Sequence, residues 1–259
     1  MDTMVVITGA GTGIGQSLAI KLADNGYDVL GLGRRLSLLE KTQVHNPERI
    51  HVLQADITQV GDREKIAKKI AKNNKKIYLV HNAATAEPIV LLKKITLKDY
   101  RQQQAVNIEA PLFLTQKLLP YLKNGRVLHI SSGLAHYALL GVGSYCISKA
   151  ALYMLYQCFR EELKEFNIAV GSADPGVVDT PMQGVLRGQD KSHLPQVEGF
   201  IRFKEAKILL SPEIVAEFLI WLLFKTSNEE FSANEWSVSD QAHHQHWLKD
   251  SKINFDWRL

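Results

Sequence analysis

A short apolar run that opens directly into a glycine-rich turn constrains the fold of this chain more than any other feature. Residues 4–8 are followed by Gly9-Ala10-Gly11-Thr12-Gly13-Ile14-Gly15, which predicts a strand, a tight turn and a helix over about residues 14–25. Glycines let the backbone approach a pyrophosphate, and the helix N-terminus favours the anion. The residues expected at this anion site are Gly9, Thr12, Gly13, Ile14 and Gly15. The glycine spacing differs from the G-x-G-x-x-G fingerprint, so a plain turn before a helix stays open on this feature alone.

The rest of the chain alternates between short apolar runs and amphipathic stretches. Residues 99–121 and 144–166 are expected to form the two long helices. This alternation is typical of an α/β fold with one doubly wound, Rossmann-type parallel sheet of about seven strands and helices on both faces. A length of 259 residues fits a single such domain. Strands are predicted at residues 4–8, 28–33, 50–54, 77–81, 125–131, 169–173 and 235–238.

A phenol, an ammonium and a hydroxyl can converge on one carbonyl in the middle of the chain. Tyr145 and Lys149 are four residues apart, and Ser131 and Ser132 precede them. On a helix this spacing places the phenol and the ammonium on one face. An ammonium stabilises phenolate, so we expect Lys149 to lower the pKa of Tyr145 from its usual value of about 10. The phenol would then give or take a proton near neutral pH.

Five motifs, in this order, resemble those of the short-chain dehydrogenase/reductase family over about residues 4–240. They are the Thr-Gly-x-x-x-Gly-x-Gly of residues 8–15, His81-Asn82-Ala83-Ala84 where the family has Asn-Asn-Ala-Gly, the helix residue Asn107, the set Ser132, Tyr145 and Lys149, and Pro175-Gly176 followed by Val178 and Thr180. The resemblance implies one domain over residues 1–240, with a substrate lid at about 182–211. It also implies cofactor contacts at Asn82, Ala83, Ala84, Pro175, Gly176, Val178 and Thr180.

The resemblance assigns one task to each of four catalytic residues. Tyr145 donates a proton to the carbonyl oxygen as hydride arrives from the nicotinamide, and Lys149 lowers the phenol pKa and bonds the nicotinamide ribose, so both also belong to the cofactor site. Ser132 polarises the carbonyl because it has the family's usual spacing from Tyr145, whereas Ser131 should point to the opposite face of its strand. Asn107 would interrupt its helix and order a water that relays protons to Lys149. Taken alone, Asn107 would more often be a polar helix residue bonded to the backbone.

The end of the second predicted strand decides which nicotinamide cofactor is expected. A carboxylate there would accept hydrogen bonds from the ribose of NAD, whereas a cation would pair with the 2′-phosphate of NADP. The chain has Gly33-Arg34-Arg35 and no carboxylate, so Arg34 and Arg35 favour NADPH. Thr12 stands where many NADP-preferring relatives carry a second basic residue, and a loop arginine is ordinarily only a surface residue. Asp56 and Ile57 match the family's adenine contacts, although Asp56 could also cap the next helix.

The loop after the sixth predicted strand resembles one branch of the family. Residues 175–183, Pro-Gly-Val-Val-Asp-Thr-Pro-Met-Gln, resemble the sepiapterin reductase and benzil reductase branch, and residues 200–204 and 209–212 extend the likeness. Sepiapterin reductases hold the pterin with an Asp in the last strand, where this chain has Ser237, with Asp240 three residues later. The expected activity is therefore NADPH-dependent reduction of a small ketone or 1,2-dicarbonyl, and sepiapterin reduction is the alternative.

Two readings from other classes stay open. A non-catalytic NADP(H)-binding sensor would keep the fold without the chemistry, and the intact set of catalytic residues argues against it. An NAD-dependent dehydrogenase that works toward oxidation is opposed by the missing carboxylate at Gly33. The partner implied in every catalytic case is a small-molecule carbonyl substrate.

The segment 241–259 departs from the family and holds His243, His244, His246, Trp247 and Trp257. We expect the histidines at the surface and no metal site, because no carboxylates or cysteines stand near them at ligand spacing. The tryptophans are expected to pack the segment onto the domain or onto a neighbouring subunit.

Two tyrosines and two cysteines near the catalytic residues need an interpretation. Tyr137 and Tyr153 would line the substrate pocket or serve only as core packing, and the sequence does not choose between these. Cys146 and Cys158 fit neither a zinc site nor a disulfide framework, so both are interpreted as packing residues.

Composition excludes several classes of function. A net charge of +4 is too small to indicate a nucleic-acid partner, and the lysine-rich residues 65–76 have the spacing of a solvated helix face. The apolar runs are shorter than the roughly 18 residues of a membrane span, and no signal peptide precedes the first strand. A cytoplasmic enzyme is expected, and the family resemblance implies a homodimer or homotetramer through the two long helices.

Overall fold

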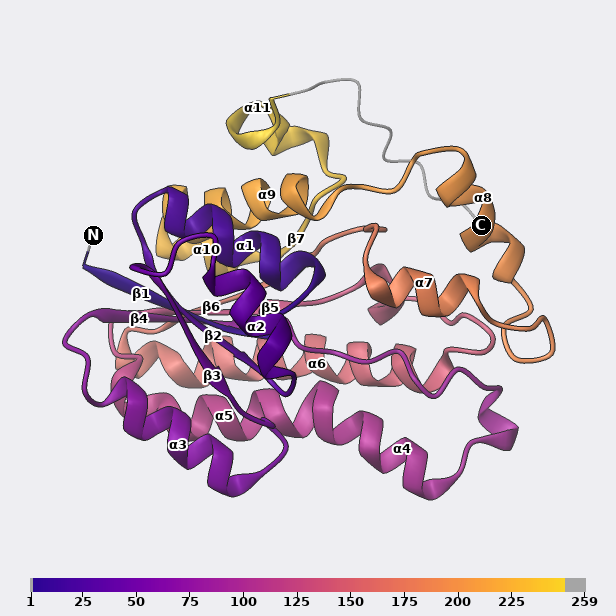
Figure 1. Ribbon diagram of the computed structural model, residues 1–259, viewed down its shortest axis with the longest axis horizontal. Coiled ribbons are helices and arrows are strands. Elements are labelled where there is room, and N and C mark those ends of the chain that lie inside the picture. Colours follow the sequence, from indigo (N-terminus) through magenta and orange to yellow (C-terminus); the bar gives the residue numbers. More distant parts are fainter. Residues whose placement is uncertain (1, 250–259) are drawn as a thin grey trace.

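The computed structural model of the chain describes residues 2–249 and contains one parallel sheet with helices on both faces (Figure 1). The sheet has seven strands in the order β3-β2-β1-β4-β5-β6-β7, and every pair is parallel. This confirms the predicted doubly wound α/β fold, and no predicted strand end differs from the observed one by more than one residue. The strands are β1 Thr3–Thr8, β2 Asp28–Gly33, β3 Ile50–Gln54, β4 Lys76–His81, β5 Arg126–Ile130, β6 Ala169–Asp174 and β7 Glu235–Ser237.

Helices cover the two faces of the sheet with separate apolar cores. On one face α1 and α9 pack side by side over β1, with α10 and α11 completing the layer. On the other face α3, α5 and α6 pack against the strands. Figure 1 shows these two layers above and below the sheet. The helices are α1 Gly13–Asp24, α2 Leu36–Gln43, α3 Val60–Ile70, α4 Leu97–Gln104, α5 Ala110–Leu118, α6 Gly143–Glu162, α7 Pro181–Arg187, α8 Val197–Glu205, α9 Pro212–Lys225, α10 Asn228–Ala233 and α11 His244–Trp247.

The first long helix is not a continuous α-helix. It consists of α4, a π-helical segment at Ala105–Glu109, α5 and a short 3-10 turn at Leu119–Tyr121. The interruption expected at Asn107 is thus confirmed, and it takes the form of a π segment, which is frequent at functional sites. The second long helix is α6, followed by a 3-10 turn at Leu163–Phe166.

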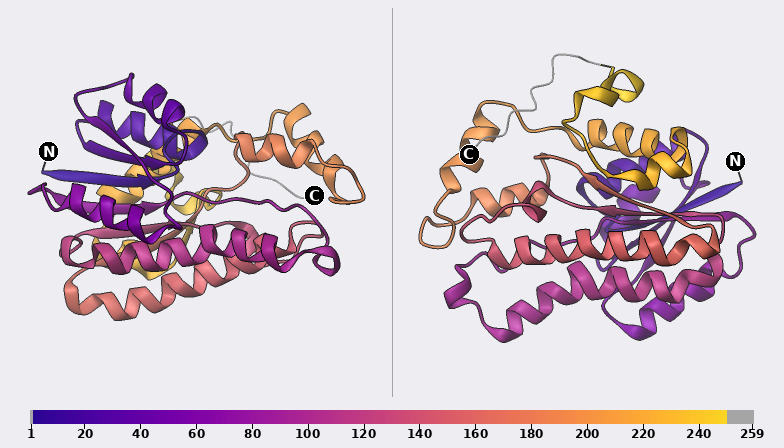
Figure 2. Two further views of the ribbon diagram at one scale, coloured as in Figure 1. Left: turned by 60° about the horizontal axis from the view of Figure 1, so that its bottom comes forward. Right: turned by 180° about the vertical axis from the view of Figure 1, so that it is seen from behind.

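The helices α7 and α8 lie together at one end of the molecule, beyond the carboxyl ends of the strands (Figure 2). Their apolar residues Leu186, Val197 and Phe200 form a third core with Val142 and Tyr145 at the start of α6. The segment 182–211, which the sequence predicts to be a substrate lid, therefore lies over the carboxyl edge of the sheet.

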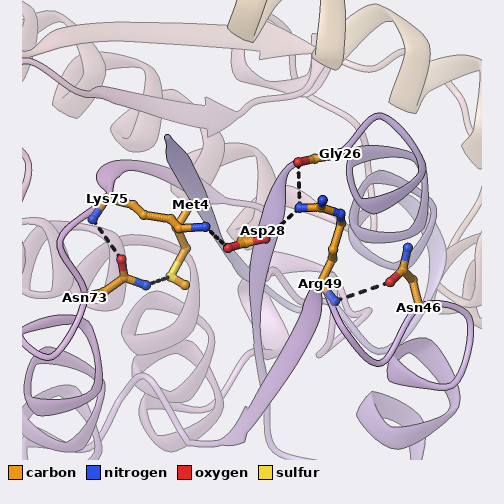
Figure 3. Close-up of polar contacts among 7 residues, drawn as sticks. All are labelled: Met4, Gly26, Asp28, Asn46, Arg49, Asn73 and Lys75. Atoms are coloured by element: carbon orange, nitrogen blue, oxygen red, sulfur yellow. Dashed lines mark hydrogen bonds and ion pairs between the residues drawn. The ribbon is translucent and has the colours of Figure 1, made fainter. Parts of the chain in front are cut away.

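The amino-terminal edge of the sheet is held by ion pairs around Asp28, the first residue of β2 (Figure 3). Arg49, just before β3, donates from Nη1 to Asp28 Oδ1 at 3.1 Å and to the Gly26 carbonyl at 2.9 Å. Lys75, just before β4, pairs with the other carboxylate oxygen of Asp28. One carboxylate therefore joins the starts of three strands, and its side chain is only 14% exposed.

The first part of the C-terminal segment packs onto α9, which corrects one expectation about its histidines. His243 is buried, because its ring stacks on Phe218 and Trp221 and its Nδ1 accepts a hydrogen bond of 2.7 Å from Trp247 Nε1. The aromatic rings of α9 therefore bury a residue that was expected at the surface, whereas His246 is exposed. Trp257 lies outside the described residues.

Cys146 is buried, but Cys158 is exposed, so its interpretation as a packing residue was wrong. Cys158 lies on the solvent-facing side of α6, and the next residue, Phe159, faces the core and is buried. Within residues 2–249 no group of three or more His, Cys, Asp and Glu side chains could hold a metal ion. Over the same range, every helix is too short or too polar to cross a membrane.

Candidate active site

The turn between β1 and α1 takes backbone conformations that favour glycine. Gly9 has φ +72° and Gly13 has φ +57°, which are left-handed values that side chains disfavour. Helix α1 begins at Gly13, and the Thr12 side chain makes no capping hydrogen bond. The amides of the first helical turn have no partners within the helix, so this turn presents donors and a positive dipole end to an anion.

Gly15 allows the turn after β4 to pack against the glycine turn. A Cβ at Gly15 would lie 2.4 Å from Asn82 Nδ2 and 2.5 Å from the Gly9 carbonyl oxygen. Asn82 uses the space to donate from Nδ2 to the Thr8 carbonyl at 2.8 Å. The Thr8 hydroxyl oxygen also accepts bonds of 3.0 Å from the amides of Asn82 and Ala83. The two turns are therefore held together by these hydrogen bonds. They lie so close that any side chain at residue 15 would push them apart.

A cavity of about 840 Å³ runs along the carboxyl edge of the sheet and brings the predicted site residues together. Two predicted site residues, Gly15 and Asn107, do not line this cavity. Gly15 lies beneath the glycine turn, and Asn107 is buried behind the residues that line the cavity. The predicted residues that line the cavity are Gly9, Thr12, Gly13, Ile14, Arg34, Arg35, Asp56, Ile57, Asn82, Ala83, Ala84, Ser132, Tyr145, Lys149, Pro175, Gly176, Val178 and Thr180.

One end of the cavity is lined by cations. Arg34 and Arg35 follow β2 and are both exposed. A smaller cavity of about 290 Å³ adjoins this end and is lined by Arg34, Asp56 and Lys65, among others. Asp56 Oδ1 accepts bonds from the Thr58 amide at 3.0 Å and from its hydroxyl at 2.7 Å. Because α3 is capped at Gln59, Asp56 closes a local turn and does not cap the helix.

The opposite end of the cavity holds the proposed catalytic pair on α6. Lys149 is 3% exposed, its Nζ donates to the Ile130 carbonyl at 2.7 Å and lies 5.5 Å from the centre of the Tyr145 ring. Burial lowers the pKa of Lys149 to about 8, although the charge of Asp174 raises it. Ser132 accepts a bond of 3.2 Å from the Leu134 amide, and its hydroxyl also bonds Tyr145.

The pKa of Tyr145 is shifted in the direction opposite to the one expected. Burial raises it above the usual value for tyrosine, while the hydrogen bond from Ser132 lowers it. The Lys149 ammonium donates its hydrogen bond to the Ile130 carbonyl and not to the Tyr145 hydroxyl. Tyr145 is therefore a neutral phenol at pH 7, which is the form that can donate a proton.

Asn107 belongs to the π segment, and hydrogen bonds to residues outside that segment hold its side chain. Its Nδ2 donates to the Thr85 carbonyl and to Ser148 Oγ, both at 2.9 Å, and its Oδ1 accepts from the Thr85 amide at 2.9 Å. These contacts join the loop after β4 to α6. Sequence reasoning did not single out Thr85 or Ser148, since neither belongs to a motif. The water relay expected of Asn107 remains a prediction.

Asp174 is the functional candidate that sequence reasoning overlooked. It ends β6, lines the cavity and accepts a bond of 3.1 Å from the Gly176 amide. Burial raises the pKa of its carboxyl group, and the charge of Glu235 adds to this effect. The available signal was an acidic residue directly before Pro175-Gly176, a loop already assigned to the cofactor.

The segment 182–211, which the family resemblance predicts to be a lid, contributes side chains to the cavity. Met182, Gln183, Leu186, Phe200 and Phe203 line it, which gives this end an apolar surface with one buried amide. The Gln183 Oε1 oxygen makes no hydrogen bond with the residues that the structure describes.

The two tyrosines left open by the sequence have different positions. Tyr137 lines the cavity, whereas Tyr153 packs edge-on against the His136 ring and is not part of the cavity wall.

The exposed Asp240 caps a short 3-10 segment through the Ala242 amide at 3.0 Å, and Ser237 bonds Ser239 at 2.8 Å.

Comparison with known proteins places this arrangement in a family. The family model described as short chain dehydrogenase matches residues 3–191. A benzil reductase ((S)-benzoin forming) of Bacillus cereus is 33% identical over 89% of this chain and 96% of its own length. The benzil reductase of Bacillus subtilis (strain 168) is 30% identical over 86% and 93%.

Solved structures agree with these relatives. A short chain dehydrogenase/reductase from Saccharomyces cerevisiae superposes with a TM-score of 0.86 and 26% identity, over 93% of this chain and 97% of that one. The sequence match, the fold and the cavity lead to one conclusion: this chain is an oxidoreductase that belongs to the short chain dehydrogenase family, with a likeness to its benzil reductases.

Proposed function

We propose that this protein is an NADPH-dependent carbonyl reductase that acts on small ketones or 1,2-dicarbonyls. The observation that carries the proposal is the position of Tyr145 in the cavity wall, bonded to Ser132 and with Lys149 Nζ 5.5 Å from the centre of its ring. The near full-length likeness to two benzil reductases supports the choice of substrate class.

The residues present fit a nicotinamide dinucleotide, the cofactor class of this family. The turn with the left-handed Gly9 and Gly13, together with the first amides of α1, forms a cradle for the pyrophosphate, and the missing side chain at Gly15 lets Asn82 pack beneath this turn. Asp56 and Ile57 would contact the adenine, and the loop from Pro175 to Thr180 would hold the nicotinamide end. When bound, the cofactor supplies the hydride.

The preference for NADPH over NADH is supported by the residues after β2. Gly33 ends the strand without a carboxylate, and Arg34 lines both the main cavity and its small neighbour. A guanidinium can bind a phosphate through two parallel hydrogen bonds. We therefore assign the 2′-phosphate to Arg34, with Arg35 as a second cation.

Each catalytic residue performs a step that its position allows. Ser132 donates a hydrogen bond to the carbonyl oxygen and Tyr145 transfers its phenol proton to the same oxygen, which completes the alcohol. Lys149 stabilises the phenolate that remains. Asn107 would order a water that returns a proton toward Lys149. The segment 182–211 would close over the substrate.

We also propose that the protein acts in the cytoplasm as a homodimer or homotetramer. Exposed apolar side chains on α5 and α6, namely Phe113, Ile147 and Met154, support association through this pair of helices. Light scattering coupled to size exclusion would give the mass directly.

The test is the absorbance decay of NADPH, in parallel with NADH, against benzil, other diketones, sepiapterin and simple aldehydes. Reduction of diketones with NADPH, lost in Tyr145→Phe, is the expected result. Turnover of sepiapterin alone would move the assignment to the pterin alternative. Tight NADPH binding without turnover of any compound would favour a sensor.

A further inference from the structure

The segment that follows β7 is attached to the body of the protein through one buried histidine. Residues 240–248 include the 3-10 turn Gln241–His243 and the short helix α11, which packs onto α9. Figure 1 shows α11 above α9, on the side away from the sheet. His243 is 5% exposed, and its ring stacks on those of Phe218 and Trp221 of α9. The proposed reaction gives this segment no task.

Both ring nitrogens of His243 make hydrogen bonds, and their partners fix the position of the ring proton. Trp247 Nε1 can only donate, so His243 Nδ1 accepts its bond of 2.7 Å and carries no proton. The Ser237 carbonyl can only accept, so Nε2 carries the proton and donates to it at 3.0 Å. The ring is therefore neutral, and it joins α11 to the end of β7.

A second proton on the His243 ring would break one of these two bonds. A protonated imidazole has two N–H groups and no acceptor, so Nδ1–H would face the indole N–H of Trp247 in a buried place. His244 differs, because its Nε2 donates to the Val238 carbonyl at 2.8 Å, and a protonated ring can still make this bond. The docking of α11 therefore depends on the neutral form of His243.

Uncharged rings face His243 from α9 and from β7. Phe218 and Trp221 stack on it, and Trp236 meets it edge-on with 5.4 Å between the ring centroids. These rings exclude water and carry no charge that would stabilise an imidazolium.

The carboxylates next to these rings in the sequence are bonded elsewhere. Glu217 of α9 pairs with Lys21 of α1 at 2.6 Å. On β7, Ser172 donates to Glu235 Oε1 at 2.8 Å, and His136 Nε2 lies 2.5 Å from Glu235 Oε2. Both carboxylates thus have partners of their own.

Charged groups within the segment act on His243 in both directions. Burial has the largest effect and lowers the pKa of His243, and the charges of His244 and His246 lower it further. The charge of Asp240 and the bond to the Ser237 carbonyl raise the pKa without reversing the shift. The pKa therefore lies below the ordinary value of 6.5, and His243 is neutral at pH 7.

The docked segment also holds part of the cavity wall. Ser239, between β7 and the 3-10 turn, lines the main cavity. Just before it, His243 bonds the Ser237 carbonyl and His244 bonds the Val238 carbonyl. The Val238 amide pairs with the end of β6 at 3.0 Å. Loss of the two histidine bonds would loosen the backbone that carries Ser239.

We propose that residues 240–248 form a pH-sensitive latch, which is docked on α9 while His243 is neutral and is released when Nδ1 gains a proton. Release loosens the cavity wall at Ser239. The latch does not rest on the proposed reductase function, because it needs only the hydrogen bonds of His243 with Ser237 and Trp247.

Acid should open the latch. In the released segment His243 titrates near its ordinary pKa of about 6.5. In the docked segment the pKa is lower, so the released form binds more protons between the two values. The ratio of released to docked protein should therefore rise by up to about tenfold for each pH unit below 6.5, until the docked pKa is reached.

The test is ¹⁹F NMR of the full chain labelled with 5-fluorotryptophan. The chain has four tryptophans, and Trp247→Phe assigns the signal of Trp247. From about pH 7.5 down to about pH 4.5 this signal should pass from a docked to a released position, while the far-UV circular dichroism is retained. His243→Gln removes the titrating group and should abolish the transition. His246→Gln is the control, because His246 lies on the same helix and is exposed.

Histidine labelled with ¹⁵N gives a second readout in the wild type. The ring nitrogens of His243, identified by coupling across the hydrogen bond to Trp247 Nε1, should report the Nε2–H form at pH 7. Their titration midpoint should coincide with the Trp247 transition. Hydrogen exchange of the Val238 amide, corrected for its intrinsic rate, should accelerate over the same pH range.

A Trp247 transition that persists in His243→Gln would overturn the latch. A Trp247 signal that keeps its docked position until the sheet itself unfolds would do the same. If His243→Gln does not fold, the wild type decides, and a His243 midpoint that does not coincide with the Trp247 transition would count against the proposal. Unchanged exchange at Val238 would overturn the link to the cavity wall.

Discussion

Two aspartates at opposite edges of the same sheet show how differently the fold uses one side chain. Asp28, at the amino edge, is bonded by Arg49 and Lys75; burial alone would raise its pKa, but these two cations lower it. Asp174, at the carboxyl edge, borders a cavity, and burial raises its pKa. The amino edge thus neutralises its charges internally, whereas the carboxyl edge keeps charged and polar groups directed at a space that a ligand can fill.

The chain topology explains this division of roles. In a doubly wound sheet the connections that leave the carboxyl ends of the strands surround the crevice where ligands bind. Here the turns after β1, β4, β5 and β6 all contribute to one cavity. Substitutions at the carboxyl edge should therefore alter rates and affinities, and substitutions at the amino edge should alter stability alone.

The largest effect is expected at the proton donor. Tyr145→Phe removes the phenol and should lower kcat for diketone reduction by about 10²–10⁴-fold, the usual contribution of a positioned acid. NADPH affinity, measured by fluorescence titration, should stay close to that of the wild type. Tyr153→Phe is the control on the same helix, because Tyr153 does not line the cavity. Equal losses in both variants would argue against Tyr145 as the donor.

Next in size is the effect of the cation after β2. Arg34→Ser should reduce the ratio of kcat/KM for NADPH to that for NADH by about 10–100-fold, because a hydrogen bond to a charged group contributes about 1.5–3 kcal/mol. Steady-state kinetics with both cofactors measures this ratio. Arg35→Ser separates the two arginines, and we expect its effect to be smaller. A ratio that Arg34→Ser leaves unchanged would remove the argument for the 2′-phosphate.

A substitution at Gly15, beneath the glycine turn, should affect both stability and binding. Gly15→Ala would place a methyl group 2.4 Å from Asn82 Nδ2, so the two turns must separate. Overpacking of this kind costs about 1–3 kcal/mol in the free energy of unfolding, and NADPH affinity should fall with it. The control is Gly61→Ala in α3, where a Cβ meets nothing within 4 Å. Denaturant unfolding that finds the two variants equally stable would contradict the close approach.

The smallest effect is expected at the amino edge. Asp28→Asn should lower the free energy of unfolding by about 1 kcal/mol at pH 7, because two cations lose a partner that is mostly buried. The folded-state pKa of Asp28 is lowered, so its contribution is present above the unfolded pKa and disappears as the pH falls through the folded value. The difference between variant and wild type should therefore vanish in acid.

Denaturant unfolding from pH 7 down to pH 2, with kcat measured at pH 7, checks both parts of this prediction. Asp24→Asn, at the exposed end of α1, is the control carboxylate. A change in kcat for Asp28→Asn would break the division between the two edges.

The strands and the glycine turn could be predicted from the sequence because their signals are local. Buried apolar runs such as Val5–Ile7 mark the strands, and glycine is the residue that most readily takes the left-handed φ values found at Gly9 and Gly13. The interruption at Asn107 was expected through the family resemblance, since nothing in its local sequence favours a π segment.

Other features depend on neighbours that are distant in the sequence. The burial of His243 is produced by the rings of Phe218 and Trp221, and the pKa of Tyr145 is raised mainly by burial, against a hydrogen bond with Ser132 that lowers it. Asp174 lines the cavity because the strand order brings the end of β6 to the same edge of the sheet as the glycine turn. Such effects arise from tertiary packing, which periodicity and spacing do not report.

The most direct test of the account is a transfer of label from the cofactor to the substrate. Wild-type protein would be incubated with benzil and NADPH carrying deuterium at both C4 positions, and the product examined by mass spectrometry and NMR. The account predicts an alcohol with one deuterium on the carbinol carbon. Alcohol that lacks deuterium, or unreacted benzil and other diketones in the presence of tightly bound NADPH, would contradict it.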